Sequence, residues 1–421
     1  MTHQLLRLAT AGSVDDGKST LVGRLLYDTK SILADQLEAI ERVSRDRGLV
    51  APDLALLTDG LRAEREQGIT IDVAYRYFAT PNRSFILADT PGHVQYTRNM
   101  VTGASTAELA LILVDARNGV VEQTRRHAAI SALLGIRHVA LVVNKMDLVE
   151  FERPVFDAIA AEFAAYTTAH GVADVVAIPI SALAGDNVVT RSDRTPWYGG
   201  PTLLEHLESV PVSSDPAEEP LRFPVQFVIR PQDPDHHDYR AYAGRVAAGT
   251  VHVGDEVSVL PSGLRSTVVG IETYDGPLLW AQAGQSVSLR LADDVDASRG
   301  DLIAGVGEAP RAVREVSATV TVVSDRPIVS GQRVLLRAGT RTVRAIVAAI
   351  TDRLDVDSLE RVDVDALRLN DIGDVELQLA EPVPLDAYSH VRATGAFLLI
   401  DDQTGATVAA GLARSAGVVA A

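Results

Sequence analysis

The sequence predicts an α/β domain, with helices on both faces of a mostly parallel sheet, followed by two all-β barrel domains. In the first half of the chain, short apolar runs alternate with helical patterns, as is typical of βαβ units. After a stretch rich in proline, serine and acidic residues, short Val-rich runs separated by turns favour small barrels. The predicted limits are 1–212 for the α/β domain, 213–220 for the linker, 221–309 for the first barrel and 310–421 for the second.

The strands expected in the α/β domain are short apolar runs, most of them followed by a helical pattern. One further run, Ile71–Phe78, alternates in character, so we expect a half-exposed and antiparallel strand there. Helical periodicity covers Ser31–Val50, Val120–Leu134 and Val155–His170. The predicted buried strands are Leu5–Ala9, Phe85–Ala88, Leu109–Val114, Val139–Val143 and Val175–Ile180.

The composition limits the classes of protein to consider. The chain has 421 residues, a net charge of −17 and no cysteine, which excludes disulfides, thiol catalysis and thiolate metal sites. The acidic charge argues against broad contact with a nucleic-acid backbone, although it leaves room for a local basic patch. No apolar run approaches the ~20 residues of a membrane span, and Met1–Leu8 has no signal-peptide pattern. We therefore expect a cytoplasmic protein without a membrane segment.

The segment Gly12–Ser19, GSVDDGKS, fits the phosphate-binding pattern G-x-x-x-x-G-K-S/T. Gly12 and Gly17 let the backbone curl so that successive N–H groups point at one phosphate. Lys18 is expected to reach the β- and γ-phosphates, and Ser19 to offer its hydroxyl to Mg²⁺. The chain has only three lysines, which suggests that a compact ammonium group is required here. The predicted nucleotide-binding residues of this loop are Gly12, Ser13, Val14, Asp15, Asp16, Gly17, Lys18, Ser19 and Thr20.

A second motif, DTPGH, directly follows the strand Phe85–Ala88. An aspartate at a strand end can hold Mg²⁺ through water, and the N–H of Gly92 can bind the γ-phosphate. His93 could orient the water that attacks the γ-phosphate; the alternative is an ordinary surface histidine. The predicted binding residues of this motif are Asp89, Thr90, Pro91, Gly92 and His93.

A third motif is Gly68-Ile69-Thr70. Thr70 can give Mg²⁺ a second protein hydroxyl while the γ-phosphate is present, which would make a loop that orders with GTP and loosens with GDP. The spacing alone fits a glycine turn before a strand equally well. With this motif included, the predicted metal ligands are Ser19, Thr70 and Asp89, and the predicted catalytic residues are Lys18, Thr70 and His93.

A fourth motif has the form N-K-x-D. The carboxylate of Asp147 can accept hydrogen bonds from N1–H and the 2-amino group of guanine, a donor pair that adenine lacks. The stem of Lys145 can lie along the base, and a later S-A-L segment can close the pocket. The predicted base-pocket residues are Asn144, Lys145, Met146, Asp147, Ser181, Ala182 and Leu183. Because the motifs occur in one order at strand ends, they predict a P-loop GTPase that uses GTP and Mg²⁺.

The order of domains and motifs resembles the translation-factor class of GTPases, and more closely the GTPase subunit of bacterial sulfate adenylyltransferase. The segments that carry the closer resemblance are Gly12–Thr20, Thr58–Phe78, Asp89–Thr106, Asp115–His127 and Ser192–Glu205. The resemblance implies a separate catalytic (small) subunit that makes adenylyl sulfate and pyrophosphate from ATP and sulfate, while this chain hydrolyses GTP to drive the reaction in sulfate assimilation. It also implies that Val14 and Ile69 screen His93. Some family members carry a fused adenylylsulfate kinase; since this chain ends at Ala421, we expect the unfused form.

Two other classes remain open at this stage. An elongation-factor-like GTPase that binds aminoacyl-tRNA would usually have histidines where this chain has Ser13 and Asp16, and the acidic charge and Trp197–Gly200 also count against it. A signalling switch with no coupled reaction would not need the long barrel half. The expected partners are therefore the catalytic subunit and GTP or GDP, without a membrane or nucleic acid.

Overall fold

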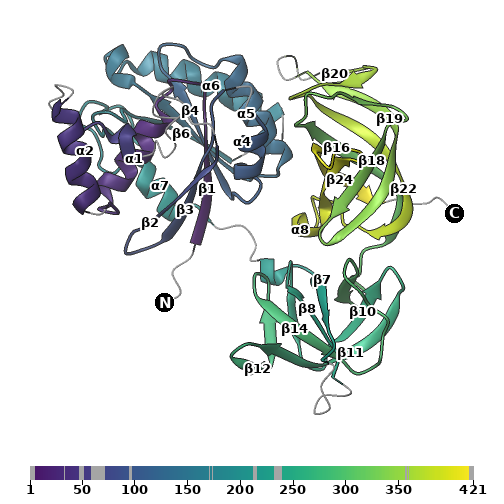
Figure 1. Cartoon of the computed structure of the whole chain (residues 1–421). Helices are drawn as coiled ribbons and strands as arrows, with labels where there is room; N and C mark the ends of the chain where they lie inside the picture. Colours follow the sequence, from purple (N-terminus) through teal and green to yellow (C-terminus); the bar gives the residue numbers. More distant parts are fainter. Residues whose placement is uncertain are drawn as a thin grey trace. The chain divides into compact units, whose positions relative to one another are not determined.

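The protein forms two compact units in its computed structural model (Figure 1). The first unit holds Met1–Ser213 and Val356–Ser358, and the second holds Ser214–Asp355 and Leu359–Ala421. The structure describes residues 5–32, 34–46, 52–57, 72–93, 97–169, 171–172, 174–211, 216–231, 239–355, 358 and 360–416.

The first unit is built on a 6-stranded sheet with the order β2-β3-β1-β4-β5-β6. Its strands are parallel except for β2, which runs antiparallel to β3 along one edge. The strands are β1 (Leu5–Ala11), β2 (Ala74–Ala79), β3 (Ser84–Asp89), β4 (Leu109–Asp115), β5 (His138–Asn144) and β6 (Asp174–Pro179). The five predicted buried strands are confirmed to within two residues at each end.

The edge strand β2 confirms the half-exposed, antiparallel strand expected from alternation. Tyr75 and Tyr77 are 45% and 68% exposed, whereas Phe78 is buried and stacks on Phe85. The prediction began the strand too early, because β2 starts at Ala74 and Asp72 and Val73 precede it. Ile71 lies outside the described residues.

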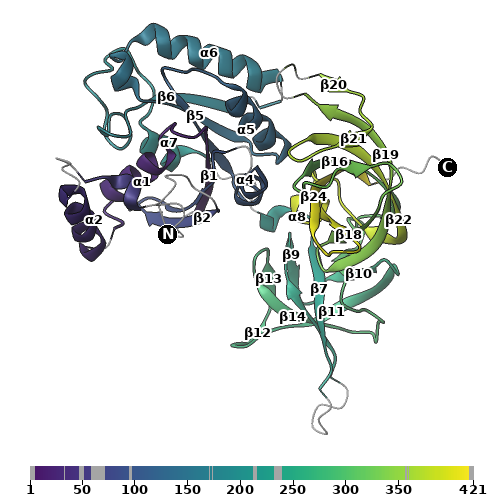
Figure 2. The same ribbon diagram turned by 45° about the horizontal axis from the view of Figure 1, so that its top comes forward.

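Helices cover both faces of this sheet (Figures 1 and 2). On one face, apolar side chains of α1 and α7 join the strand residues in a single core that includes Leu21, Leu25, Leu203 and Leu207. Helices α4, α5 and α6 contact β1, β4 and β5 and lie on the other face. The helices are α1 (Lys18–Asp28), α2 (Ala34–Asp46), α4 (Thr97–Ala104), α5 (Glu122–Leu133), α6 (Arg153–Ala169) and α7 (Leu203–Ser209), with short 3₁₀ turns η1 (Leu54–Leu57) and η3 (Met146–Val149).

Among the described residues, no helix is long and apolar enough to span a membrane.

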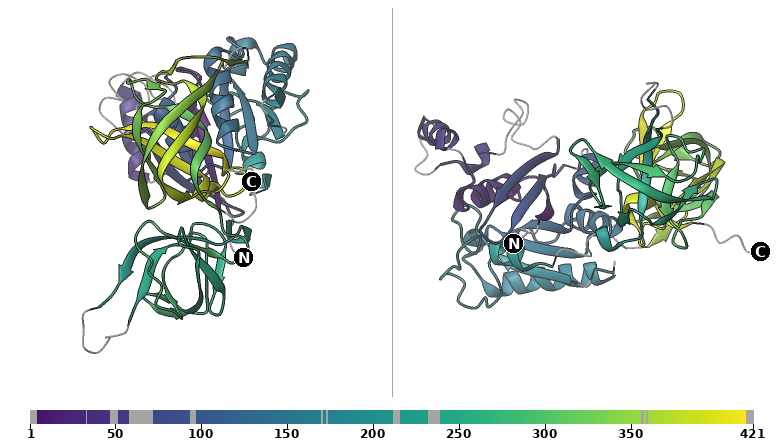
Figure 3. Two further views of the ribbon diagram at one scale, coloured as in Figure 1. Left: turned by 90° about the vertical axis from the view of Figure 1, so that its right-hand side faces the viewer. Right: turned by 90° about the horizontal axis from the view of Figure 1, so that it is seen from below.

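The second unit contains two 7-stranded antiparallel sheets, each closed by an additional strand pairing, β10–β11 in one and β18–β19 in the other. Figure 3 shows the curvature of both sheets. The strands of the first sheet are β7 (Arg222–Ile229), β8 (Ala241–Arg245), β10 (Glu256–Leu260), β11 (Leu264–Thr273), β12 (Gly276–Leu278), β14 (Ser286–Leu291) and β15 (Leu302–Gly305). The turn η4 (Pro216–Glu218) precedes it, and β9 (Thr250–His252) and β13 (Trp280–Gln282) pair in a separate two-stranded sheet.

The elements of the second sheet and its flanking segments are β16 (Ala312–Val322), β17 (Ile328–Val329), β18 (Arg333–Ala338), β19 (Arg341–Leu354), β20 (Arg361–Val362), β21 (Ala366–Leu367), β22 (Ile372–Pro384), α8 (Arg392–Gly395), β23 (Ala396–Asp401) and β24 (Thr407–Ala416). Each closed sheet encloses its own core of Val, Leu, Ile and Ala side chains. We keep 213–220 for the linker and 221–309 and 310–421 for the barrels as our proposed limits.

A buried ion pair joins the two barrels. Arg222 on β7 is 1% exposed, and its Nε and Nη2 each lie 2.8 Å from a carboxylate oxygen of Asp386, which follows β22. The carbonyls of Leu221 and Glu308 accept the remaining bonds of the guanidinium, and the Thr394 hydroxyl donates to Asp386. The pair is therefore bidentate and its hydrogen-bonding groups are satisfied, which is the condition under which a buried ion pair is tolerated.

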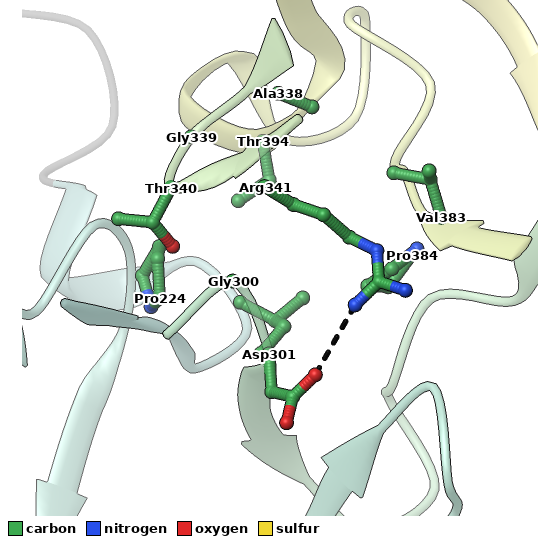
Figure 4. Close-up of a pocket in the computed structure, with 11 residues that line it drawn as sticks. Pro224, Gly300, Asp301, Ala338, Gly339, Thr340, Arg341, Val383, Pro384 and Thr394 are labelled. Carbon is green, nitrogen blue, oxygen red and sulfur yellow. Dashed lines mark hydrogen bonds and ion pairs between the residues drawn. The ribbon is translucent and has the colours of Figure 1, made fainter. Parts of the chain in front are cut away.

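A second ion pair lies at a small pocket between the barrels (Figure 4). Arg341 at the start of β19 points toward Asp301, with 3.2 Å between Nη1 and Oδ1, and its Nη2 lies 3.1 Å from Glu381. The pocket has a free volume of about 20 Å³, enough for one water molecule and too small for an organic ligand.

We predict that Arg222→Ala destabilises the barrel pair by about 3–5 kcal/mol, because it leaves the Asp386 carboxylate buried without its partner. Urea unfolding of the full chain, followed by a signal from the barrels, measures this loss. The matched control is Arg290→Ala, which breaks a solvent-exposed pair with Glu272 and should cost less than about 1 kcal/mol. Equal losses in the two variants would contradict the assignment.

Candidate nucleotide-binding site

The described motif residues gather at the carboxyl edge of the parallel sheet. The P-loop follows β1, which has β3 on one side in the sheet and β4 on the other. The connection after β1 leads to β2 on one side, and the connection after β3 leads to β4 on the other side. Asp89 ends β3, Asn144 ends β5 and Ser181 follows β6. In open α/β sheets, ligands bind at such a switch point.

The P-loop holds the Lys18 side chain in a buried position. Its Nζ donates to the carbonyls of Gly12 and Ser13, at 2.8 and 2.7 Å. Burial lowers the pKa of Lys18, and the charges of Asp89 and Asp16 oppose that shift. A single Cβ added at Gly92 would lie 2.3 Å from this Nζ, so the second motif needs a glycine here to approach the P-loop.

A carboxylate fixes the first turn of the P-loop. The Asp16 side chain is 4% exposed and accepts a hydrogen bond from the backbone N–H of Ser13 at 2.5 Å. Burial raises the pKa of Asp16, although Lys18 opposes this. Asp15 and Gly17 have φ values of 68° and 91°, and Gly17 caps the start of α1. The loop therefore ends on a helix N-terminus, which favours an anion.

The remaining residues of the first two motifs lie as follows. Ser19 and Thr20 are in the first turn of α1, and Val14 is 38% exposed. Thr90, Pro91 and Gly92 are buried, whereas His93 is exposed.

Asp89 is oriented by a neighbouring strand. Thr10 pairs with it in the β1–β3 register and donates from its hydroxyl to Asp89 Oδ1 at 2.8 Å. Thr90 closes the arrangement by donating to the carbonyl of Thr10 at 2.5 Å. Sequence reasoning did not single out Thr10; its place on β1 just before the P-loop and opposite Asp89 is the signal that could have found it.

The donor types present suit Mg²⁺, which prefers carboxylate and hydroxyl oxygen. Ser19 follows β1 and Asp89 ends β3, and these two strands are adjacent and parallel. Thr70, the third predicted ligand, lies outside the described residues, as do Gly68 and Ile69. Within the described ranges, there is no group of three or more His, Cys, Asp or Glu side chains that could hold a metal ion.

Asn144 connects three loops of the site. Its Nδ2 donates to the carbonyl of Asp16 at 2.7 Å, and its Oδ1 accepts from the N–H of Ala182 at 2.9 Å. The side chain is 2% exposed, and a Cβ at Gly17 would lie 2.4 Å from its Nδ2. The P-loop, the N-K-x-D motif and the S-A-L segment are thus held together by one carboxamide.

Lys145 is held by an aspartate that the motif search did not assign. Its Nζ lies 3.0 Å from Oδ2 of Asp115 at the end of β4, and Arg117 also binds this carboxylate through its backbone N–H and guanidinium. Burial alone would raise the pKa of Asp115, but the hydrogen bonds from Arg117 and Lys145 outweigh it and hold that pKa far below its usual range. The signal was present in the sequence, since Asp115 ends a buried strand next to β5.

The other predicted base-pocket residues follow Lys145 or the end of β6. Met146 is buried and donates its N–H to the carbonyl of Ile180 at 3.1 Å. Asp147 is partly exposed in η3. Ser181 and Ala182 are buried, and Leu183 is 73% exposed.

Arg24 of α1 supports the S-A-L segment and was not predicted. Its Nε and Nη2 donate to the carbonyls of Ala182 and Leu183, at 3.2 and 2.5 Å. The helix that begins at the P-loop therefore also holds the S-A-L segment, which is predicted to close the base pocket. No residue pattern pointed to this contact, which joins positions 158 residues apart.

Two family models match this chain, one in its first half and one near its C-terminus. Residues 3–212 match the model of the elongation factor Tu GTP binding domain, and residues 315–414 match the GTP-eEF1A C-terminal domain-like family. A solved structure of Sup35 complexed with GDP aligns over 98% of this chain at 23% identity, with a TM-score of 0.44, too low to add weight to the sequence matches.

Relatives that match nearly the whole of this chain have higher sequence identity to it than the Sup35 structure has. The bifunctional enzyme CysN/CysC of Mycobacterium tuberculosis is 57% identical over 97% of this chain and 67% of its own length. Sulfate adenylyltransferase subunit 1 of Laribacter hongkongensis is 50% identical over 99% of this chain and 86% of its own. The same subunit of Aeromonas salmonicida is 49% identical over 97% of this chain and 86% of its own.

The fold, the loops at its sheet edge and the first family model define a GTPase of the elongation factor Tu class. This confirms the predicted α/β GTPase domain and its GTP-binding character. Within that class, the chain belongs to the family of sulfate adenylyltransferase subunit 1.

Proposed function

We propose that this chain hydrolyses GTP and couples that hydrolysis to the formation of adenylyl sulfate and pyrophosphate from ATP and sulfate on a separate catalytic subunit. The observation that carries the proposal is the 50% identity to sulfate adenylyltransferase subunit 1 across 86% of that relative. The word "subunit" in the relative's name implies a second chain, on which we place the ATP site. The same proposal places the protein in the cytoplasm, in sulfate assimilation.

The P-loop supplies the positive charge for the phosphates in this proposal. Lys18 already forms two hydrogen bonds to loop carbonyls, so a phosphate oxygen can replace a carbonyl as acceptor without moving the loop. In a buried site such an interaction is stronger than in water. Ser19, Thr70 and Asp89 would hold Mg²⁺, which neutralises phosphate charge when bound.

Positioning of the reacting groups is the remaining task. Gly92 lies beside Lys18 Nζ, which supports a role for its backbone in sensing a γ-phosphate held by the lysine. His93 comes next and is exposed, so it can reach a water on the open side of the site. We assign to His93 the orientation of that water, since phosphoryl transfer depends mainly on positioning and charge neutralisation.

The base pocket selects guanine through Asp147. This residue lies in η3, which is anchored through Met146 to Ile180 and through Lys145 to Asp115. We predict that Asp147→Asn weakens GTP binding and shifts the preference to xanthosine triphosphate, because the amide can donate where the carboxylate only accepts. Competition titrations with the two nucleotides measure the shift. A variant that still prefers GTP would show that the base is read elsewhere.

The coupling role gives a prediction for the reconstituted complex. With the catalytic subunit, ATP and sulfate present, added GTP should raise the yield of adenylyl sulfate above the level that ATP alone supports. A non-hydrolysable GTP analogue should not sustain that yield, because the uphill reaction needs the free energy of hydrolysis. A yield that does not depend on the guanine nucleotide would reject coupling, and tight binding of aminoacyl-tRNA would favour the elongation-factor alternative.

The water-orienting role of His93 gives a further prediction. His93→Ala should leave GTP affinity nearly unchanged, since the P-loop and base pocket supply it, but should slow single-turnover hydrolysis by about a hundredfold or more. Stimulation of adenylyl sulfate formation by GTP should fall in parallel. His252→Ala, which changes an exposed histidine on β9, is the matched control. Hydrolysis at the wild-type rate in His93→Ala would reject the catalytic role.

A further inference from the structure

The segment Ala184–Thr202, which follows the S-A-L motif, contacts both loops that we assign to the guanine base. We propose that this clamp segment is a positioning element for base recognition, with Trp197 and Asn187 as its principal positioning residues. The inference rests on the proposed base site, and it adds a specificity-determining role for residues that touch neither phosphate nor metal in that site.

Trp197 fixes the loop that carries Asp147. That loop ends at Phe151, whose N–H donates to the carbonyl of Met146 at 2.8 Å. Glu150 and Phe151 both have positive φ values, 53° and 55°, a conformation that non-glycine residues adopt only when neighbours hold them there. The indole Nε1 of Trp197 donates to the carbonyl of Phe151 at 3.1 Å, so it constrains the end of the loop.

Side chains of the clamp segment also cover this region. The ring of Trp197 lies 5.4 Å from that of Phe156 on α6, and the guanidinium of Arg194 lies 5.1 Å from the ring centroid of Phe151. Arg194 is held in turn by Asp186, at 3.4 Å. Phe151 itself is 8% exposed. The loop is therefore packed between the clamp segment and α6.

Asn187 fixes the second base loop. It is fully buried with φ 55°, and its Nδ2 donates to the carbonyl of Pro179 at 2.9 Å and to the hydroxyl of Thr195 at 2.8 Å. Its Oδ1 accepts from the N–H of Ser192 at 2.8 Å. Next to it, the carbonyl of Asp186 accepts from the N–H of Ser181, at 3.3 Å. The S-A-L loop is thus tied to the same segment as the Asp147 loop.

This arrangement sets the distance between the two walls of the base pocket. Recognition of the 2-amino group by Asp147 depends on that distance, because a displaced carboxylate leaves a donor of the base unpaired. The P-loop, by contrast, is held by Lys18 and Asp16. Loosening the clamp segment should therefore reduce selectivity for the base more than it changes the chemistry at the γ-phosphate.

The test compares GDP with inosine diphosphate, which lacks the 2-amino group. Trp197→Phe keeps an aromatic ring and removes the indole N–H; it should weaken GDP binding by about three- to tenfold, the range for one lost hydrogen bond. Binding of inosine diphosphate should change less, so the ratio of the two dissociation constants should move toward one. In steady-state GTP hydrolysis with the partner bound, KM should rise while kcat stays at the wild-type value.

Two other variants keep the test informative if Trp197→Phe does not fold. Arg194→Ala removes a half-exposed side chain and should shift the same ratio in the same direction by a smaller factor. Trp280→Phe changes the other tryptophan of the chain, on β13 of a barrel, and should shift neither affinity nor ratio.

The outcomes separate this inference from the proposed function. If Trp197→Phe and Arg194→Ala weaken GDP and inosine diphosphate equally, or lower kcat with KM unchanged, the clamp segment does not position the base pocket. If Asp147→Asn, measured alongside, leaves the preference for GDP over inosine diphosphate unchanged, the base site itself is wrong and the inference falls with it. The positioning role is supported if, in both Trp197→Phe and Arg194→Ala, the ratio of the dissociation constants for inosine diphosphate and GDP moves toward one while kcat stays at the wild-type value.

Discussion

The buried carboxamide of Asn144 is the interaction on which the nucleotide loops depend. It donates to the carbonyl of Asp16 and accepts from the N–H of Ala182, so it uses both of its groups at once. A carboxylate in its place would lose the donor, and an apolar side chain would leave two buried backbone groups unpaired, at about 1–3 kcal/mol each. The P-loop and the base pocket therefore share one reference point at the sheet edge.

Charge at the same edge is arranged in pairs. Three buried carboxylates, Asp16, Asp89 and Asp115, receive hydrogen bonds from a backbone N–H, a threonine hydroxyl and two basic side chains respectively. Three basic groups, Lys18, Lys145 and Arg117, lie beside these carboxylates.

In the second unit, a pair of buried charged side chains connects the two barrels. Arg222 and Asp386 pair across the two barrels, and their remaining hydrogen-bonding groups are satisfied. Each barrel has its own closed sheet and core. The two barrels form one compact unit in spite of their separate cores, and loss of either partner of the pair would leave an uncompensated buried charge between them.

The sequence by itself determined the order of elements in the α/β domain, and it predicted the chemistry of the nucleotide loops. Strand and helix periodicity and the P-loop and N-K-x-D patterns are local, because each depends on residues close together in the chain. The start of β2 was less well placed, since a half-exposed strand has a weak boundary signal.

Only the tertiary structure decided which side chains hold those loops in place. The Asp115–Lys145 pair, the Arg24 contacts with the S-A-L loop and the Trp197 bond to Phe151 join residues 30 to 159 positions apart. Such contacts leave no periodic trace in a single sequence, because the partners meet only after the parallel sheet has brought its strand ends to one edge.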